Sequence, residues 1–280
     1  MRRRVTAVIL AGMGLTVVLL VLPWIVRVRA EADKAGCLSR FERLGQFAAL
    51  YAQPPKGANP ADLPQAVPPG TLVNPDLPPD RRLSWIPDIL PFLDQKLQPV
   101  ADLAPRFDRR GAWDAAANLE VGRTRLVLFT CPGPLPDPLA DGQMPTQFVG
   151  IAGVGTDAAT LSLGPPVPSK AGCFRYDAPT PLRLIRDHDG LSSTALFAET
   201  ASELGPWVRG GFATVRGLDV NEGAKRPIGA GGQFGGTYAG VGGFGFADGS
   251  ARFLTDRTSA AVLWAHFTIA GKGTDPIPGE

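Results

Sequence analysis

The first 52 residues carry two hydrophobic patterns joined end to end. Residues 5–26 contain no charged side chain, and at 1.5 Å per residue they span about 33 Å as a helix. Residues 27–52 then place apolar side chains at steps of three and four, which is typical of a helix with one buried face. These side chains are Cys37, Leu38, Phe41, Leu44, Ala48 and Tyr51. The pattern predicts one long helix whose second half packs on a domain.

The flanking charges predict that residues 5–26 form a transmembrane helix. Their length matches a hydrocarbon core of about 30 Å. Three arginines precede the segment and two follow it, and the compact basic end, residues 1–4, should stay cytoplasmic. We therefore expect a single-pass protein of the cytoplasmic membrane with most of its chain outside, in the periplasm. A cleaved signal peptide is the alternative, but its apolar region usually has 7–15 residues.

The rest of the chain has short apolar segments between many turns. Residues 53–80 contain nine prolines and are expected to form a linker or surface loop ahead of a domain at 81–280. Two short helices are predicted, over 84–97 and 259–267. Residues 243–246 and 251–254 flank an Asp-Gly turn, which predicts a hairpin. The other predicted strands are 124–130, 148–154, 182–185, 194–199 and 212–215.

Composition excludes several classes of protein. The chain has 34 glycines and 28 prolines, which is incompatible with a helical bundle because both residues destabilise helix interiors. The net charge of +2 comes from the N-terminus, since residues 30–280 carry 23 basic and 26 acidic side chains. Such a body has no basic surface for nucleic acid.

No motif indicates catalysis, a cofactor or a metal. Residues 240–245 spell G-x-G-x-x-G, but a strand and not a helix follows, so dinucleotide binding is not indicated. Residues 187–190 resemble the start of a calcium loop, although a hairpin turn explains them equally well. The chain has two histidines, His188 and His266, but no G-x-S-x-G motif that would supply a serine nucleophile. We expect no catalytic, cofactor-binding or metal-binding residues and no enzymatic activity.

The order of short motifs resembles the planctomycete family of prepilin-like proteins with domain of unknown function 1559, also described as solute-binding-protein-like. Residues 22–32 (LPWIVRVRAEA) resemble the family's L-P-A-V-Q-x-V-R-E-A-A, and Cys37, Leu38, Leu44 and Gly45 continue the match. Further segments that follow the family pattern are Ser84-Trp85 with 90–95, 112–114 with Asn118-Leu119, 129–132, 146–150 with Gly153, 189–194 with Glu199, and 246–250 with Arg252-Phe253.

This sequence departs from the family at informative positions. Family members often have a histidine ten positions before the aspartate of D-G-S, where this chain has Tyr238. Type IV pilin relatives have a cleavage site and a glutamate at the start of the helix. Arg4 and Ile9 stand at the corresponding positions here, so we expect a permanent anchor and not an assembling subunit.

The resemblance implies an α+β fold, pilin-like, with the long helix packed on an antiparallel sheet. It implies a pseudopilin-like structural or interaction protein that contacts the bilayer through residues 5–26 and other proteins through its body. The motif turns would be Asp189-Gly190 and Asp248-Gly249. The alternative is an anchored module that binds a small molecule or glycan at the glycine-rich segment 229–249 with Trp207, Phe234 and Tyr238.

The three cysteines allow one disulfide. Outside the cytoplasm such a bond persists, and an odd number leaves one thiol over. We expect Cys37 to join Cys131, which would pin the helix to the strand at 124–130 and close a loop of about 94 residues. A bond from Cys173 to Cys37 or to Cys131 is one alternative, and three buried free thiols are the other.

Overall fold

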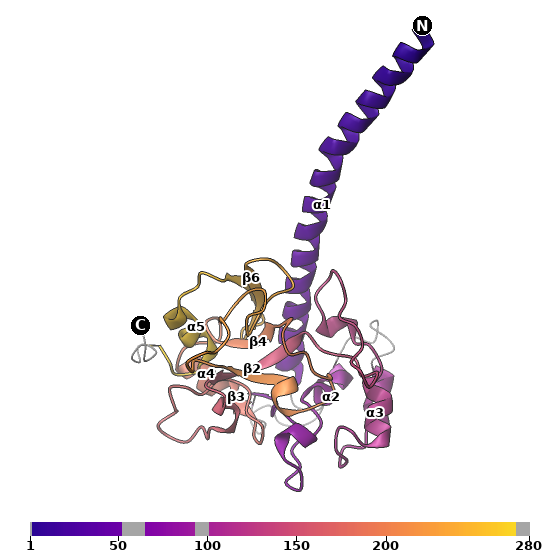
Figure 1. Ribbon diagram of the computed structural model, residues 1–280. Coiled ribbons are helices and arrows are strands. Elements are labelled where there is room, and N and C mark those ends of the chain that lie inside the picture. Colours follow the sequence, from indigo (N-terminus) through magenta and orange to yellow (C-terminus); the bar gives the residue numbers. More distant parts are fainter. Residues whose placement is uncertain (1, 52–64, 93–100, 273–280) are drawn as a thin grey trace.

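One long helix, α1 (Arg2–Tyr51), runs from the N-terminus into the body of the protein. The computed structural model describes residues 2–51, 65–92 and 101–272; of residues 2–18, 20, 47–51 and 101 it describes the backbone alone. In Figure 1 the first half of α1 extends away from the body, while its second half lies beside β6. The predicted continuous helix over residues 27–52 is therefore confirmed to within one residue.

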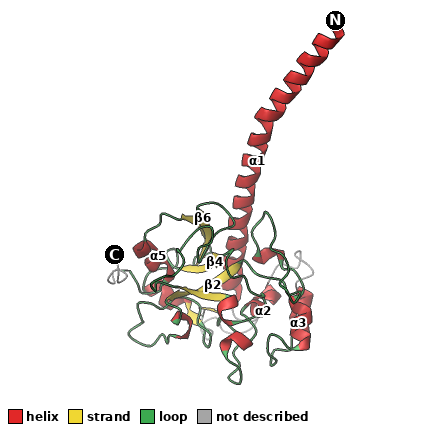
Figure 2. Ribbon diagram, viewed as in Figure 1, coloured by secondary structure: helices red, strands yellow, loops and turns green. Residues whose placement is uncertain are grey.

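The body contains a five-stranded sheet of order β5-β2-β4-β6-β7 (Figure 2). Its strands are β2 (Phe148–Val154), β4 (Ala195–Glu199), β5 (Val215–Leu218), β6 (Val241–Phe246) and β7 (Ala251–Thr255). A separate two-stranded sheet pairs β1 (Ala66–Val67) with β3 (Thr180–Pro181). The fold is thus α+β, and the predicted strand at 148–154 and the hairpin at β6–β7 are confirmed.

The expected antiparallel sheet is in fact mixed. Three neighbouring pairs are antiparallel, but β5 runs parallel to β2. After β4 the chain crosses past β2 through residues 200–214 before it joins the sheet at the far edge. Such a crossover permits a parallel pair, whereas a hairpin does not. It also places β5 three residues later than the predicted strand at 212–215.

Short helices surround the sheet. The α-helices are α2 (Ile86–Ile89), α3 (Ala116–Gly122), α4 (Leu182–Asp187) and α5 (Ala260–Phe267). The 3₁₀ turns are η1 (Pro79–Arg81), η2 (Leu90–Phe92), η4 (Ala101–Arg106), η5 (Val127–Phe129), η6 (Ala158–Thr160) and η7 (Gly211–Ala213). The predicted helix over 259–267 is confirmed, and that over 84–97 corresponds to α2 and η2, with residues 93–97 outside the described part.

Two predicted strands are wrong. Residues 124–130 contain the turn η5 and no strand, because the amides of Phe129 and Thr130 bond to carbonyls three residues earlier and not to a neighbouring strand. Residues 182–185 lie in α4. Leu128, Phe129 and Ile185 are buried in these segments whereas Val127 is exposed, and an apolar run this short does not distinguish a strand from a turn or a short helix.

Residues 53–80 are expected to form a linker or surface loop, and in the part that the structure describes they are a largely irregular loop packed on the body. Residues 52–64 lie outside that part. From residue 65 on, the chain belongs to the body: Val67 and Leu72 are buried in the main apolar cluster, and β1 contacts α1. Prolines exclude regular strands but not burial, since their side chains are apolar.

Each face of the main sheet buries its own apolar cluster. Neighbouring residues divide between them: Phe148 faces the cluster that contains Phe41 of α1, while Val149 faces the cluster that contains Phe267 of α5. This is the alternation of a strand. The sheet therefore lies between α1 on one face and α5 on the other.

The described residues contain no helix that combines the length and apolar character needed to cross a membrane. Most side chains of the predicted transmembrane segment, residues 5–26, lie outside the described part.

Candidate functional site

The junction between α1 and the sheet is built from one aromatic ring and two glycines. Phe41 of α1 lies against Gly243 and Gly245 of β6; a Cβ at these positions would come within 2.8 and 3.2 Å of its ring. Since side chains alternate along a strand, the phenylalanines of β6, Phe244 and Phe246, face α5 instead. The sequence VGGFGF thus leaves a groove on one face for the helix.

Two further glycines bring the helix backbone close to the body. A Cβ at Gly45 would lie 2.8 Å from the Cα of Gly249 in the β6–β7 turn, and one at Gly36 would lie 2.9 Å from the Pro132 ring. Backbones approach this closely only where one side chain is missing. The glycines of α1 therefore mark its contact face, a signal in the sequence that the apolar pattern alone does not reveal.

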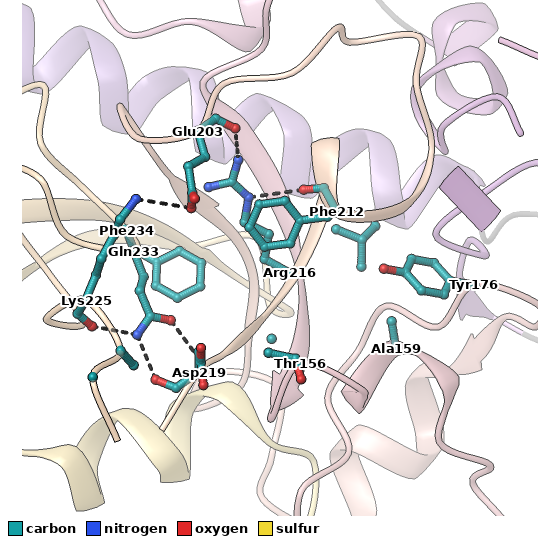
Figure 3. Close-up of a pocket in the computed structure, with 14 residues that line it drawn as sticks. Thr156, Ala159, Tyr176, Glu203, Phe212, Arg216, Asp219, Lys225, Gln233 and Phe234 are labelled. Atoms are coloured by element: carbon teal, nitrogen blue, oxygen red, sulfur yellow. Dashed lines mark hydrogen bonds and ion pairs between the residues drawn. The ribbon is translucent and has the colours of Figure 1, made fainter. Parts of the chain in front are cut away.

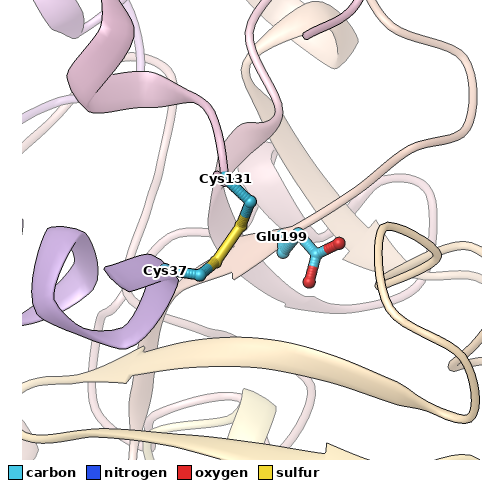
Figure 4. Close-up of side chains that lie close together, drawn as sticks. All are labelled: Cys37, Cys131 and Glu199. Carbon is cyan, nitrogen blue, oxygen red and sulfur yellow. A yellow bond between two sulfur atoms is a disulfide. The ribbon is translucent and has the colours of Figure 1, made fainter. Parts of the chain in front are cut away.

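A disulfide joins α1 to the body at the same junction. Cys37 is bonded to Cys131, with their Cα atoms 4.8 Å apart, and both residues are fully buried (Figure 4). Cys173 is the free, buried thiol, and burial raises its pKa. The structure therefore contains the pairing expected from the sequence. The expected attachment to a strand is wrong, because Cys131 follows η5 and belongs to no strand.

Glu199, the last residue of β4, lies beside the disulfide (Figure 4). Its carboxylate accepts hydrogen bonds from the amides of Thr237 (2.8 Å) and Gly243 (3.1 Å). Burial raises its pKa, although these hydrogen bonds act in the opposite direction. Its oxygen and the two sulfurs lie within 4.8 Å of one another, but sulfurs in a disulfide are not thiolate metal ligands. The arrangement therefore fits a structural role.

Tyr238 closes the junction at the point where α1 leaves the body. Its hydroxyl lies 2.9 Å from the carbonyl oxygens of both Asp33 and Pro132, so one phenol O–H is shared between the helix and the loop after Cys131. Burial raises the pKa of Tyr238, and the nearby Glu199 acts in the same direction. Tyr238 therefore joins α1 to the body.

Arg40 makes a second polar contact that the sequence analysis missed. One guanidinium nitrogen donates to the carbonyl oxygens of Val127 and Thr130 and to the Thr130 hydroxyl. Arg40 lies one turn after Cys37 and therefore on the same side of the helix. The three-residue spacing from Cys37 is the sequence signal that places Arg40 on the contact face of α1.

Asp189 and Gly190 form a turn that holds the C-terminal segment. Asp189 is 8 % exposed, and its carboxylate accepts hydrogen bonds from the amides of Gly271 (2.8 Å) and Lys272 (3.2 Å). Gly190 has φ 85°, a conformation that favours glycine. A calcium loop at residues 187–190 would need a further carboxylate to complete its ligands, and Glu199, the candidate for that role, lies elsewhere beside the disulfide.

Asp248 and Gly249 form the turn between β6 and β7. The Asp248 carboxylate accepts hydrogen bonds from the amide (2.9 Å) and hydroxyl (2.6 Å) of Ser250, and Gly249 has φ 86°. Because Gly249 also contacts Gly45, this turn is part of the surface that receives α1.

The three aromatic residues proposed to bind a ligand together lie in different places. Trp207 is buried against Phe107 and donates from Nε1 to the carbonyl of Thr124. Phe234 is buried against Phe267, and Tyr238 belongs to the helix junction. The three side chains therefore do not share one pocket: Trp207 and Tyr238 are engaged elsewhere, and only Phe234 lines a cavity, the one beside β5.

The two histidines bond to backbone carbonyls. Nδ1 of His188 lies 2.9 Å from the Leu184 oxygen, and Nδ1 of His266 lies 2.7 Å from the Ser193 oxygen. Burial lowers the pKa of His266. A carbonyl bonded to Nδ1 fixes the tautomer of each neutral ring with its proton on Nδ1.

A cavity of about 310 Å³ lies beside β5, and the sequence analysis did not predict it (Figure 3). Its lining comes from five separate parts of the chain, so no continuous motif marks it. Its lining includes Thr156, Tyr176, Glu203, Phe212, Arg216 and Asp219.

Together, these features define a class of protein: a mixed α+β body that holds a long N-terminal helix through a disulfide and a glycine groove. The sequence profile described as SBP_bac_10, protein of unknown function (DUF1559), matches residues 64–225, more than half of the chain, and the protein belongs to this family. Neither a curated protein nor a solved structure matches the chain.

Proposed function

We propose that this protein is a membrane-anchored, extracytoplasmic structural or interaction protein, similar to a pseudopilin and without enzymatic activity. Residues 5–26 would insert in the cytoplasmic membrane, with residues 1–4 inside and the body in the periplasm. Its partners would be the bilayer and other proteins, and the slightly acidic body argues against nucleic acid.

The exposed apolar surface of α1 carries this proposal. Before the helix enters the body, Leu19 is 63 % exposed and Trp24 is 65 % exposed. An apolar helix surface of this kind is unfavourable in water and is normally covered by lipid or protein. The other exposed apolar side chains in this part of α1 are Val21, Leu22, Ile25, Val26 and Val28.

The covalent junction supports the same function. The disulfide, the Phe41 groove and the Tyr238 hydrogen bonds all fix the second half of α1 to the body. A rigid attachment holds a body at a set orientation to a membrane, whereas a flexible linker does not. A disulfide also persists best outside the cytoplasm, where the proposal places the body.

Membrane fractionation of the full-length chain in a bacterial host tests the anchor. We expect the protein to resist extraction by alkaline carbonate and the body to be digested by protease added to the periplasm. Intact mass should show an uncleaved N-terminus. A protein that stays in the soluble fraction without detergent would contradict the proposal, and loss of residues 1–4 alone would indicate pilin-type processing.

A matched pair of variants makes this test specific. The double substitution Leu19→Asp and Leu22→Asp should release the protein from the membrane, because charged side chains are costly in hydrocarbon. Val73→Asp changes an equally exposed apolar residue on the body and should leave fractionation unchanged. Equal effects of both changes would mean that α1 is not the anchor.

The second candidate function is an anchored module that binds a small molecule or glycan. The cavity beside β5 favours it, since small-ligand sites usually have volumes from about 300 Å³ upward. The predicted site over residues 229–249 contributes only Gln233 and Phe234 to this cavity.

A further inference from the structure

We propose that the cavity beside β5 binds a neutral sugar ring, with Phe212 as the stacking surface and the hydroxyls of Tyr176 and Thr156 and the carboxylate of Asp219 as hydrogen-bonding groups. This inference rests on the second candidate function and is independent of the anchor. Figure 3 shows these residues around the cavity, with the Tyr176 hydroxyl turned toward the others.

The backbone around the cavity is held in unusual conformations. Glu203 has φ 53°, the one positive value among the described residues other than glycine, and its carbonyl accepts a hydrogen bond from Arg216. Gly217 of β5 lies so near the chain after β2 that a Cβ would be 2.1 Å from the Gly155 oxygen. The positive φ of Glu203 is strained backbone, which concentrates at ligand sites and switch regions, whereas Gly217 shows only a close backbone approach.

The buried cation of the cavity, Arg216, uses most of its hydrogen-bond donors within the protein. Arg216 donates to the carbonyl oxygens of Phe212 (3.1 Å), Ser202 (2.9 Å) and Glu203 (2.6 Å) and to the Thr200 hydroxyl (3.2 Å). Burial lowers its pKa to about 10, which leaves it charged at neutral pH. With four donors used, its guanidinium has no paired donors left for a carboxylate or phosphate.

The remaining charged and amide groups also pair within the lining. Lys225 lies 3.3 Å from the Glu203 carboxylate and donates to the Ser202 hydroxyl. The side chain of Gln233 bonds to the backbone of Asp219 in both directions, at 2.7 Å each. An acidic ligand would have to break these pairs, so the lining does not favour one.

The groups that remain suit hydroxyls and a ring face. Among residues 2–51, 65–92 and 101–272, no partner bonds to the hydroxyls of Tyr176 and Thr156 or to Oδ2 of Asp219, while Oδ1 of Asp219 accepts from Asn221. An unengaged carboxylate accepts a sugar hydroxyl and repels an acid. Tyr176, Thr156 and Asp219 come from three separate segments that face one cavity.

Phe212 supplies the apolar part of the site. It is 53 % exposed, and the Arg216 guanidinium lies 4.4 Å from its ring centroid, which fixes the ring from one side. The opposite face of such a ring attracts the slightly positive C–H groups of a pyranose, because the aromatic face is electron-rich. The volume, about 310 Å³, fits one small ring better than a long oligosaccharide.

The position of the cavity permits binding while the helix is anchored. The cavity is lined by β5 at one edge of the sheet, whereas α1 contacts β6 and β7 at the other edge. A ligand at β5 therefore does not compete with the helix junction.

Binding of D-glucose and D-glucuronate to the full-length chain in lipid nanodiscs tests the proposal by saturation-transfer NMR and calorimetry. The two sugars differ in one carboxylate, and nanodiscs avoid sugar detergents. We expect glucose to bind saturably and more tightly than glucuronate. Equal or tighter binding of glucuronate, or no binding of glucose, would overturn the proposal, and neither result would bear on the anchor.

Variants assign the binding to this cavity. Phe212→Ala should weaken glucose binding about tenfold, and Tyr176→Phe, which removes one hydroxyl and keeps the ring, about threefold. Phe92→Ala removes a partly exposed ring on η2 outside the cavity and should leave affinity unchanged. Unchanged affinity in both cavity variants, with unfolding temperatures equal to that of the native chain, would contradict the site.

Discussion

The ring of Phe41 on α1 lies so close to Gly243 of β6 that a Cβ at residue 243 would be 2.8 Å from its Cε2 atom. The same ring stacks on Phe148 of β2, with centroids 4.1 Å apart and an angle of 20° between the planes. One side chain thus connects the helix with two strands of the sheet. The junction therefore depends on the absence of a side chain in β6 as much as on the presence of one in α1.

Gly243→Ala should destabilise the body. The added methyl group would displace the buried Phe41 ring, and such overpacking typically costs about 1–3 kcal/mol. Urea unfolding of the full-length chain measures the change. Gly164→Ala is the matched control, because a Cβ at Gly164 meets no atom within 4 Å. Equal stabilities of the two variants would show that the Phe41 contact does not constrain residue 243.

Loss of the Cys37–Cys131 disulfide should lower the unfolding free energy by about 2–5 kcal/mol, because the bond closes a long loop in the unfolded chain. The Cys37→Ala and Cys131→Ala double variant measures this. A reductant should lower the unfolding free energy of the native chain but leave that of this variant largely unchanged. Cys173→Ala keeps the disulfide, so its unfolding should remain sensitive to reductant; a loss of that sensitivity would place the bond elsewhere.

Tyr238→Phe should cost about 1 kcal/mol, the usual net value of one hydrogen bond, because the Asp33 and Pro132 carbonyls lose a shared donor. It should also expose the Asp33 region of α1 to faster amide hydrogen exchange. Tyr176→Phe removes a hydroxyl that bonds to no residue in the described chain and should leave stability unchanged. The opposite ranking of the two variants would contradict the role of Tyr238.

Glu199 should make stability depend on pH. Burial raises its pKa in the folded state above the ordinary value of 4.5, so the folded protein retains a proton that the unfolded chain releases. The stabilisation is complete below the unfolded pKa and is lost as the pH rises through the folded pKa. The unfolding free energy of the native chain relative to Glu199→Gln should therefore fall as the pH rises from 4.5.

An exposed glutamate gives the control for this pH dependence. Glu222→Gln lies on the surface and should follow the native chain at every pH. A constant difference between the native chain and Glu199→Gln over the same range would mean that Glu199 does not titrate abnormally in the folded state.

The elements that the sequence alone determined are those set by local patterns. A continuous run of helix-compatible residues defined α1, a short apolar run defined β2, and the Asp248-Gly249 turn defined the β6–β7 hairpin. In each case the periodicity or the turn chemistry lies within a few neighbouring residues, so the conformation follows without knowledge of the rest of the chain.

Only the tertiary structure decided which distant residues meet. The glycines of β6 serve as a groove because Phe41 lies on them, Tyr238 joins α1 to the body because its hydroxyl reaches Asp33, and residues 124–130 form a turn because no strand pairs with them. The cavity beside β5 exists because five segments converge there. These arrangements depend on contacts between residues far apart in the chain, which no local pattern encodes.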